Sequence, residues 1–309
     1  MTETIISDTP NISRNDDVSG SSDFASRGMI TLAIAELVHS LAPHLKGIFG
    51  AHLDARLREL REQRGEAIEH LARRRFRVFG KGESRIAAKL EGLSLDEGAS
   101  LHYQVKFPET LVKVVVRNRD AALAEQTLAR LDAEIRERLG WLVYGVEDTS
   151  LAEVVGAELL ARGQTLATAE SCTGGMIGSL ITAVPGSSAY YLGGGVTYSN
   201  EEKVRQLGVR ETTLIAHGAV SSEVVEEMAA GVRERSGASY GLAVSGVAGP
   251  GGGTEDKPVG TVWVGVARPD GGTYSKKFHW PGDRNRVRTL AAHWALSSLR
   301  YMMQQGSGS

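Results

Sequence analysis

Residues 164–176, which read QTLATAESCTGGM, decide the fold of the larger part of this chain. The first half is a short apolar run that predicts a buried strand, and residues 176–183 continue as an apolar helix after two glycines. Ser171 therefore lies where a strand passes into a helix. The free N–H groups and positive dipole of a helix start hold anions and developing oxyanions. Ser171 is on this reasoning either a nucleophile or a helix cap, since serine also favours the N-cap.

Length and composition limit the classes of protein to consider. The chain has 309 residues, enough for roughly two domains, with the 41% hydrophobic and 23% charged content of a soluble globular protein. Its 35 basic and 37 acidic residues nearly cancel, which excludes a bulk field for nucleic acid or anionic membranes. The single cysteine, Cys172, excludes an internal disulfide, and no Cys/His cluster has zinc-site spacing. We expect a cytoplasmic protein without metal or cofactor.

The two ends and the first third of the chain are less informative. Residues 1–28 predict a disordered leader without a secretory pattern, and residues 304–309 predict a flexible tail. The longest apolar stretches fall far short of the about 20 residues of a membrane span. Residues 29–75 are helical in pattern, with acids and bases alternating at i,i+4 spacing. This favours a solvated face over a nucleic-acid patch, although residues 73–77 contain an arginine cluster.

Residues 76–147 predict a small α+β domain. Helices are expected over residues 84–90 and 119–139, the second ending at Gly140, and paired strands over residues 101–107 and 111–116. Two strands and two helices can cover one another's apolar faces. Residues 78–84 lack the Walker spacing, so we interpret them as a structural turn rather than a phosphate loop.

Residues 148–303 carry the strongest pattern. After a helix over residues 151–160, strands are expected at residues 165–169, 194–199, 241–245, 260–267 and 273–279, with helices between most of them. The turn at residues 268–272 makes the last two strands an antiparallel hairpin. The pattern predicts an α/β domain with a mixed β-sheet and helices on its faces.

Polar residues follow several of these strands, where ligands bind in open α/β sheets. Tyr198 and Lys203 follow the second strand and are expected to reach back toward Ser171. Neither His217 nor His293 follows a strand, so a Ser–Lys pair is more plausible than a Ser–His–Asp triad. Taken alone, Lys203 also fits an exposed helix lysine paired with a neighbouring glutamate.

Six ordered motifs closely resemble the CinA C-terminal domain family. They are AESCTGG at residues 169–175, PGSS at 185–188, TYSNEEK at 197–203, HGAVS at 217–221, GVAGP at 246–250 and KPVGTV at 257–262. Residues 75–84, RFRVFGKGES, also look like the entry to the KH-like middle domain of full-length CinA proteins. The resemblance covers residues 148–303 and extends to the KH-like segment.

The resemblance implies nicotinamide mononucleotide deamidase activity, which yields nicotinate mononucleotide and ammonia in pyridine-nucleotide recycling. It implies that Ser171 is the nucleophile and Lys203 the general base, with Tyr198 as a polar partner in catalysis. Substrate-binding residues would be Thr173, Gly174, Gly175, Ser245, Gly246, Gly249 and Arg284. Position 245 is more often threonine in the family, and serine keeps the hydroxyl. The N–H groups near Thr173 and Gly174 are expected to stabilise the oxyanion.

The chain departs from full-length CinA proteins at its start. Their N-terminal molybdopterin-binding-like domain, linked to a metal-dependent ADP-ribose pyrophosphatase activity, is not recognisable in residues 1–75, so that activity is not carried over; residues 29–75 contain at most a remnant. We expect a homodimer or higher homo-oligomer that acts on a small molecule, without membrane or nucleic acid. The alternative is a non-catalytic CinA-like scaffold, although the KH-like segment lacks a Gly-x-x-Gly clamp and an aromatic stacking surface for RNA.

Overall fold

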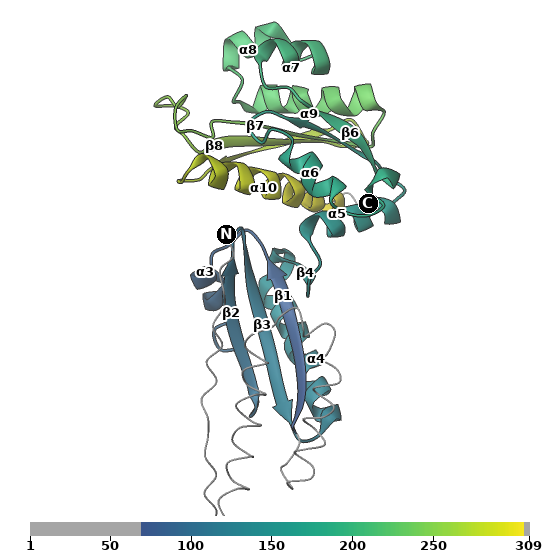
Figure 1. The fold of residues 1–309 in the computed structure, drawn as a ribbon, viewed down its shortest axis with the longest axis vertical. Coiled ribbons are helices and arrows are strands. Elements are labelled where there is room, and N and C mark those ends of the chain that lie inside the picture. Colours follow the sequence, from purple (N-terminus) through teal and green to yellow (C-terminus); the bar gives the residue numbers. More distant parts are fainter. Residues whose placement is uncertain (1–68, 306–309) are drawn as a thin grey trace, which may run out of the picture. The chain divides into compact units, whose positions relative to one another are not determined.

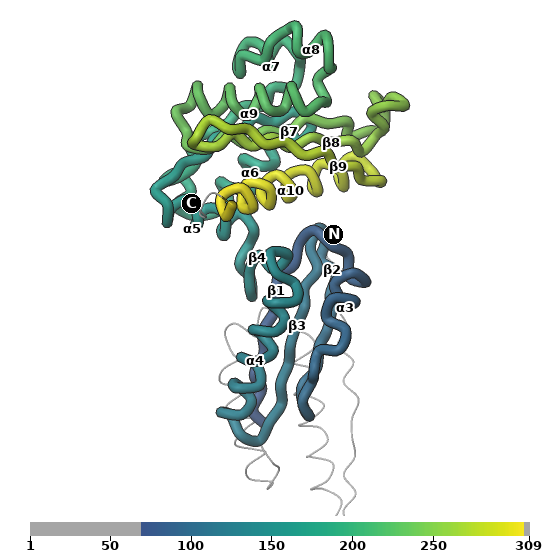
Figure 2. Tube along the Cα trace, turned by 180° about the vertical axis from the view of Figure 1, so that it is seen from behind, coloured from purple at the N-terminus to yellow at the C-terminus, as the bar shows by residue number. Residues whose placement is uncertain are grey.

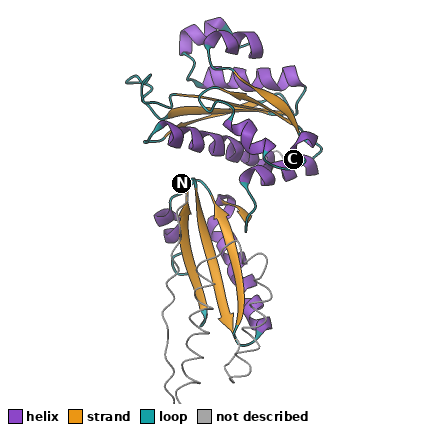
Figure 3. Ribbon diagram, viewed as in Figure 1, coloured by secondary structure: helices purple, strands orange, loops and turns teal. Residues whose placement is uncertain are grey.

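The computed structural model describes residues 69–305, which form a four-stranded and a five-stranded sheet with helices (Figures 1 and 3). The predicted leader, the predicted tail from residue 306 and most of the predicted helical segment at residues 29–75 lie outside this range. Within residues 69–305, none of the helices combines the length and apolarity that crossing a bilayer requires.

The four-stranded sheet is antiparallel, with strand order β2-β3-β1-β4, and α4 packs on β1 and β3. Its elements are β1 (His70–Val78), α3 (Glu83–Lys89), β2 (Ala99–Lys106), β3 (Glu109–Asn118), α4 (Ala121–Leu139), a short 3-10 helix (Gly140–Leu142) and β4 (Val143–Val146). The carboxylate of Asp120 caps α4 by accepting from the N–H of Ala122 at 2.8 Å, and Gly140 ends that helix. Both helices and both strands of the predicted α+β domain are present.

Strand β1 corrects the helix predicted through residue 75. It begins at His70 and pairs with β3 along its whole length. Ala72, Phe76 and Val78 face the core with the period of two that a strand requires. The position between them on that face is Arg74, whose guanidinium reaches Asp132 on α4 at 3.5 Å. The arginine interrupts the apolar alternation, and this hides the strand from a reading of the sequence.

The five-stranded sheet has the order β6-β5-β7-β8-β9. Its elements are α5 (Leu151–Ala161), β5 (Leu166–Glu170), α6 (Met176–Thr182), a 3-10 helix (Ser187–Ala189), β6 (Tyr191–Val196), α7 (Asn200–Leu207), α8 (Glu211–His217), α9 (Ser222–Ser236), β7 (Tyr240–Gly246), β8 (Thr261–Ala267), β9 (Thr273–His279) and α10 (Arg284–Gln305). Strand β5 is parallel to β6 and β7, whereas β8 is antiparallel to β7 and β9. The predicted mixed sheet and its terminal hairpin are confirmed.

Several boundaries in this domain differ from the sequence expectation, most of all at β6, which begins at Tyr191 rather than at residue 194. Strand β6 ends at Val196, not at residue 199, because Ser199 is the N-cap of α7 and accepts from the N–H of Glu202 at 3.2 Å. The β-forming residues Thr197 and Tyr198 therefore belong to the turn between strand and helix. Helix α10 continues to Gln305, two residues into the predicted tail.

Helices cover both faces of this sheet. Helices α5, α6 and α10 lie on one face, and α9 with α7 and α8 beyond it lies on the other, as both views show (Figures 1 and 2). Strand β7 alternates accordingly, with Leu242 and Val244 in the cluster on the α10 side and Ala243 in the cluster on the α9 side. On the face toward α9, the buried strand residues of the cluster are alanines, namely Ala167, Ala169, Ala243 and Ala267, with Trp263 of β8 partly buried beside them.

The close approach of α9 is measurable at Gly265 on β8. A Cβ at this position would lie 2.6 Å from the carbonyl oxygen of Val225 on α9. Since real Cβ atoms keep a longer distance to backbone oxygen, a side chain would push the helix off the sheet.

We therefore expect Gly265→Ala to lower the free energy of unfolding by about 1–3 kcal/mol, as overpacking in a close-packed interior does. The matched control is Gly251→Ala, because a Cβ at Gly251 meets nothing within 4 Å. Chemical unfolding of both variants beside the wild type measures the difference. Equal unfolding midpoints for the two variants would contradict the proposed close approach.

Candidate active site

The candidate site lies where the parallel strands end. The carboxyl ends of β5, β6 and β7 meet at one edge of the sheet, because β5 pairs in parallel with both neighbours. Ser171 directly follows β5, Lys203 lies in α7 just after β6, and Ser245 is near the end of β7. The topology thus brings together polar residues that are far apart in the sequence.

Ser171 and Lys203 meet at this edge. The Nζ atom of Lys203 lies 3.3 Å from the Oγ atom of Ser171, and the two residues are 32 positions apart. Ser171 is 8% exposed and Lys203 only 1%. Helical side chains lean toward the N-terminus of their helix, and this direction takes Lys203 back over the first turn of α7 to Ser171.

The amine of Lys203 is surrounded by backbone oxygen rather than by carboxylates. Its Nζ atom lies within hydrogen-bond distance of three carbonyl oxygens, those of Thr197 at 3.0 Å, Tyr198 at 3.2 Å and Ser199 at 3.4 Å. Glu202, a partner that an exposed lysine would favour, instead pairs with Arg205 at 2.7 Å. Burial lowers the pKa of Lys203 below its ordinary value, because desolvation penalises the ammonium form. The charge of Glu201 acts in the opposite direction.

This arrangement suits a neutral amine that faces a hydroxyl. A neutral lysine has two N–H donors and one lone pair. When the two nearest carbonyls, those of Thr197 and Tyr198, accept the two donors, the lone pair is left for the Ser171 hydroxyl. The pair therefore has the geometry of a nucleophile beside its general base.

The turn after Ser171 has a defined set of backbone bonds. The N–H of Ser171 donates to Val244 at 3.0 Å, and the N–H of Gly174 donates to the carbonyl of Ser171 at 3.1 Å. Across residues 69–305, the N–H groups of Thr173 and Gly175 find no hydrogen-bond partner. Of the two oxyanion donors expected from the sequence, Thr173 is thus free and Gly174 is engaged within the turn.

Two charged side chains support this turn. The buried carboxylate of Glu170 accepts from the N–H groups of Ile177 at 3.1 Å and Gly178 at 2.8 Å, which satisfies the start of α6 in place of a capping side chain. Arg288 on α10 donates to the carbonyls of Cys172 at 3.2 Å and Thr173 at 2.8 Å. The backbone that follows Ser171 is therefore held both by the end of β5 and by the last helix.

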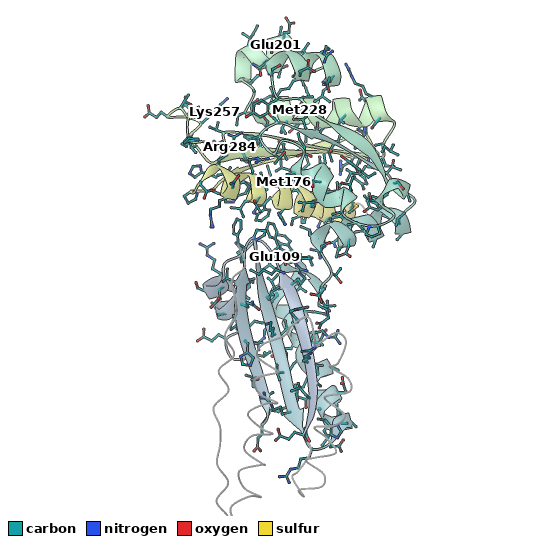
Figure 4. All side chains as sticks on the ribbon, viewed as in Figure 1. Glu109, Met176, Glu201, Met228, Lys257 and Arg284 are labelled. Atoms are coloured by element: carbon teal, nitrogen blue, oxygen red, sulfur yellow. The ribbon has the colours of Figure 1, made fainter. Side chains whose placement is uncertain are left out.

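A second group of predicted residues meets at the start of α10. The guanidinium of Arg284 donates to the phenol oxygen of Tyr198 and to the carbonyl of Gly249, both at 3.0 Å. Tyr198 is 61% exposed, and its hydroxyl meets Arg284 rather than Ser171. Figure 4 labels Arg284 and Lys257 at the same end of this domain. The arginine thus joins the turn after β6 to the glycine-rich run after β7.

The remaining predicted residues have structural contacts. The hydroxyl of Ser245 donates to the carbonyl of Ala219 at 2.7 Å and is buried. A Cβ at Gly246 would lie 2.7 Å from a methyl of Val262, so this backbone has no room for a side chain on that side. His293 contacts the carbonyl of Thr289 on its own helix, with 2.8 Å between Nδ1 and the oxygen, and does not pair with Ser171. The described residues contain no group of three or more His, Cys, Asp or Glu that could hold a metal ion.

The comparisons with known proteins agree with the motifs. Residues 148–303, about half of the chain, match the family described as the CinA C-terminal domain. The chain belongs to the CinA family. Residues 73–145 match a second description, the KH domain of damage-inducible protein CinA. The predicted family and the predicted fold class, an α/β domain beside a KH-like domain, are confirmed.

The CinA relatives have general names. The chain is 44% identical over 225 residues to a putative competence-damage inducible protein of Halothermothrix orenii, covering 72% of this chain and 54% of the relative. It is 48% identical over 229 residues to a CinA-like protein of Shewanella loihica, covering 74% and 53%. The chain spans about half the length of these curated relatives.

Among solved structures, the chain is similar to the competence/damage inducible protein CihA of Agrobacterium tumefaciens. The two are 38% identical with a TM-score of 0.48, covering 49% of this chain and 93% of the other. A second similar structure is a CinA superfamily protein of Klebsiella pneumoniae, 36% identical with a TM-score of 0.48, covering 51% and 99%.

The sequence did not reveal that Glu170 and Arg288 bind the backbone around Ser171 in this CinA domain. Glu170 immediately precedes Ser171, and Arg288 lies one helical turn after the predicted Arg284. The i,i+4 spacing of the two arginines was the available signal, since such residues share a helix face. The backbone partners of Arg288 carry no side-chain pattern that a sequence reading could have matched to it.

Cys172 is a rival nucleophile beside Ser171, and its environment disfavours the thiolate. Burial raises the pKa of the Cys172 thiol to about 12, and the residue is 5% exposed. A thiol with this pKa stays protonated at neutral pH. The hydroxyl of Ser171, by contrast, has the amine of Lys203 3.3 Å away.

The single cysteine makes this difference measurable. We expect iodoacetamide at pH about 8 to label Cys172 on the order of 100-fold more slowly in the native chain than in the unfolded chain, because both thiolate formation and access are suppressed. Intact-protein mass against time, with and without denaturant, gives the two rates. Similar rates would show that the thiol is accessible and that the serine has a true competitor.

Proposed function

We propose that this CinA-family chain is an amidohydrolase that converts nicotinamide mononucleotide to nicotinate mononucleotide and ammonia through an acyl-enzyme on Ser171. The observation that carries the proposal is the buried Nζ atom of Lys203, 3.3 Å from the Ser171 hydroxyl. The motifs around that pair are the ones that the sequence shares with CinA deamidase domains. In metabolism this reaction belongs to pyridine-nucleotide recycling.

Acylation begins with the neutral amine. Lys203 takes the proton of the Ser171 hydroxyl as Oγ attacks the carboxamide carbon, and the carbonyl oxygen of the substrate becomes an oxyanion. The tetrahedral intermediate then collapses. Its C–N bond breaks while Lys203 returns the proton to the leaving nitrogen, and ammonia departs. The lysine is neutral again, and Ser171 carries the nicotinoyl ester.

Deacylation uses the same two residues. Lys203 accepts a proton from water, and the oxygen of that water attacks the ester carbon. When the second intermediate collapses, Oγ of Ser171 leaves and recovers its proton from Lys203. The balance is one amide and one water converted to one carboxylic acid and one ammonia, with no redox change and an unchanged enzyme.

The turn supplies electrostatic stabilisation. The N–H of Thr173 is free, lies in the turn that follows Ser171 and is a suitable donor to the oxyanion. One such donor is typically worth about 100- to 1,000-fold in rate.

The phosphate and the pyridinium ring of the mononucleotide suit the residues that meet at the start of α10, namely Arg284, Tyr198 and Gly249. Arg284 uses two donor nitrogens on Tyr198 and Gly249, and the positive guanidinium suits the phosphate of the nucleotide. The exposed ring of Tyr198 suits the cationic pyridinium, since aromatic faces attract cations. The backbone at Gly246 and Gly249 would lie along the ribose phosphate.

The first test of this function compares two adjacent substitutions. Ser171→Ala removes the attacking oxygen, so we expect kcat for ammonia release from nicotinamide mononucleotide to fall on the order of 1,000-fold or more. Cys172→Ala should keep kcat within about threefold, because the thiol takes no part in the reaction.

Excess chelator serves as the control, and it should leave the wild-type rate unchanged. A strict metal requirement would overturn the Ser–Lys mechanism. Tolerance of alanine at position 171 with loss of activity at position 172 would move the chemistry to the thiol.

The second test is the pH dependence of kcat. The active form of Lys203 is the neutral amine, and its pKa lies below the ordinary lysine value of 10.5. Rising pH removes the proton, so kcat is expected to increase with pH and to level off, with its midpoint below 10.5. Ammonia release between about pH 6 and about pH 10 measures the curve. A kcat that decreases throughout this range would rule out a lysine base, and Cys172→Ala should reproduce the wild-type curve.

A further inference from the structure

Arg288 contacts the peptide groups that follow the nucleophile. Its Nε donates to the carbonyl of Cys172 at 3.2 Å, and its Nη2 donates to the carbonyl of Thr173 at 2.8 Å. Within the described part of the chain, no other side chain hydrogen-bonds the peptide groups between Cys172 and Gly174. The guanidinium thus spans two successive carbonyls of the turn.

The planarity of the peptide bond links these carbonyls to the N–H groups on their far side. In a trans peptide, the C=O of one residue and the N–H of the next point in opposite directions. The carbonyl of Cys172 shares its peptide with the N–H of Thr173, the free donor of the turn. Fixing that carbonyl therefore fixes the direction of the Thr173 N–H, which points away from Arg288.

The second carbonyl that Arg288 binds, that of Thr173, is also linked through its peptide to an N–H group of the turn. The carbonyl of Thr173 shares its peptide with the N–H of Gly174, which donates to the carbonyl of Ser171 at 3.1 Å. Arg288 therefore also orients the bond that closes the turn on the nucleophile itself. A Cβ at Gly174 would lie 3.4 Å from Nη2 of Arg288, so the guanidinium lies directly beside this glycine.

Charge adds to orientation. A cation at the oxygen of a peptide group draws electron density toward that oxygen, and the N–H at the other end becomes a stronger donor. The positive charge of Arg288 thus reaches the oxyanion through the peptide between Cys172 and Thr173. The other hydrogen bonds near the turn do not replace Arg288. The N–H of Ser171 binds the carbonyl of Val244 before the turn, and Glu170 binds the N–H groups of Ile177 and Gly178 after it.

We propose that Arg288 is a positioning residue that orients and polarises the Thr173 N–H as the oxyanion donor. The proposal rests on the amidohydrolase function proposed above. It assigns Arg288 a role separate from that of Arg284, one turn earlier on α10, which faces Tyr198 and Gly249.

The test compares Arg288→Gln and Arg288→Lys with Arg286→Gln. Arg286 lies on the same helix, and its guanidinium sits 4.8 Å from the ring centre of Phe107, so it controls for the loss of an α10 arginine. We expect Arg288→Gln to lower kcat for nicotinamide mononucleotide about 100-fold, with KM within about threefold, as loss of a transition-state interaction does. Arg288→Lys keeps the charge and one contact and should lose about tenfold. Arg286→Gln should remain within about twofold.

A second readout does not depend on the substrate. Diisopropyl fluorophosphate phosphorylates an activated serine: Oγ bonds to phosphorus, fluoride leaves, and the hydroxyl proton passes to the base. Its phosphoryl oxygen needs the same donor, so Arg288→Gln should slow labelling of Ser171, followed by intact mass, by about 100-fold. Thermal midpoints identify any unfolded variant, and if Arg288→Gln is unfolded, Arg288→Lys decides the question.

The outcomes separate the two proposals. Unchanged kcat and unchanged labelling in Arg288→Gln would overturn the positioning role, and so would a loss confined to KM. If the wild type is labelled at Ser171 but releases no ammonia, and Arg288→Gln is labelled more slowly, the positioning role stands and the substrate assignment fails. A wild type that neither reacts with the probe nor deamidates the nucleotide would refute both.

Discussion

The arrangement of the C-terminal domain at the site depends on one constraint, which is that the buried amine of Lys203 must find hydrogen-bond acceptors. An amine that is 1% exposed needs acceptors, and the carbonyls of Thr197, Tyr198 and Ser199 provide them. Those carbonyls are available because β6 ends at Val196 and α7 begins at Asn200. The parallel pairing of β5 and β6 then places Ser171 beside the amine. The end of β6, the start of α7 and the pairing of β5 with β6 together produce the contact between Lys203 and Ser171.

The turn after Ser171 depends on opposite charges that act through the backbone. Glu170 accepts N–H groups at the start of α6, and Arg288 donates to carbonyls before it. A carboxylate on N–H groups and a cation on carbonyls both follow the direction of the peptide dipoles. The turn needs no side chains at Gly174 and Gly175, both of which have positive φ.

Local sequence signals predicted those features that local chemistry controls. The hairpin of β8 and β9 was found because residues 268–272 form a turn, and the second strand has the predicted bounds Thr273–His279. The contact between Ser171 and Lys203 was expected because each follows a strand in a matched motif. Strand β1 was missed, since Arg74 occupies a core-facing position and reaches Asp132 with its charged end. Arg288 was missed because it binds carbonyls, which every residue has, and only the fold selects which ones it meets.

The long sequence separation between the turn and α10 has a consequence for synthesis. Arg288 and Cys172 are 116 residues apart, and strands β6, β7, β8 and β9 all lie between them in the sequence. Contacts of such separation form late, because loop closure precedes them. A chain still emerging from the ribosome therefore contains Ser171 and Lys203 well before it contains α10, the helix that binds the turn after Ser171. On the proposed mechanism, Ser171 gains its full reactivity only when the fold is complete, and a product truncated before α10 lacks the arginine that holds its turn.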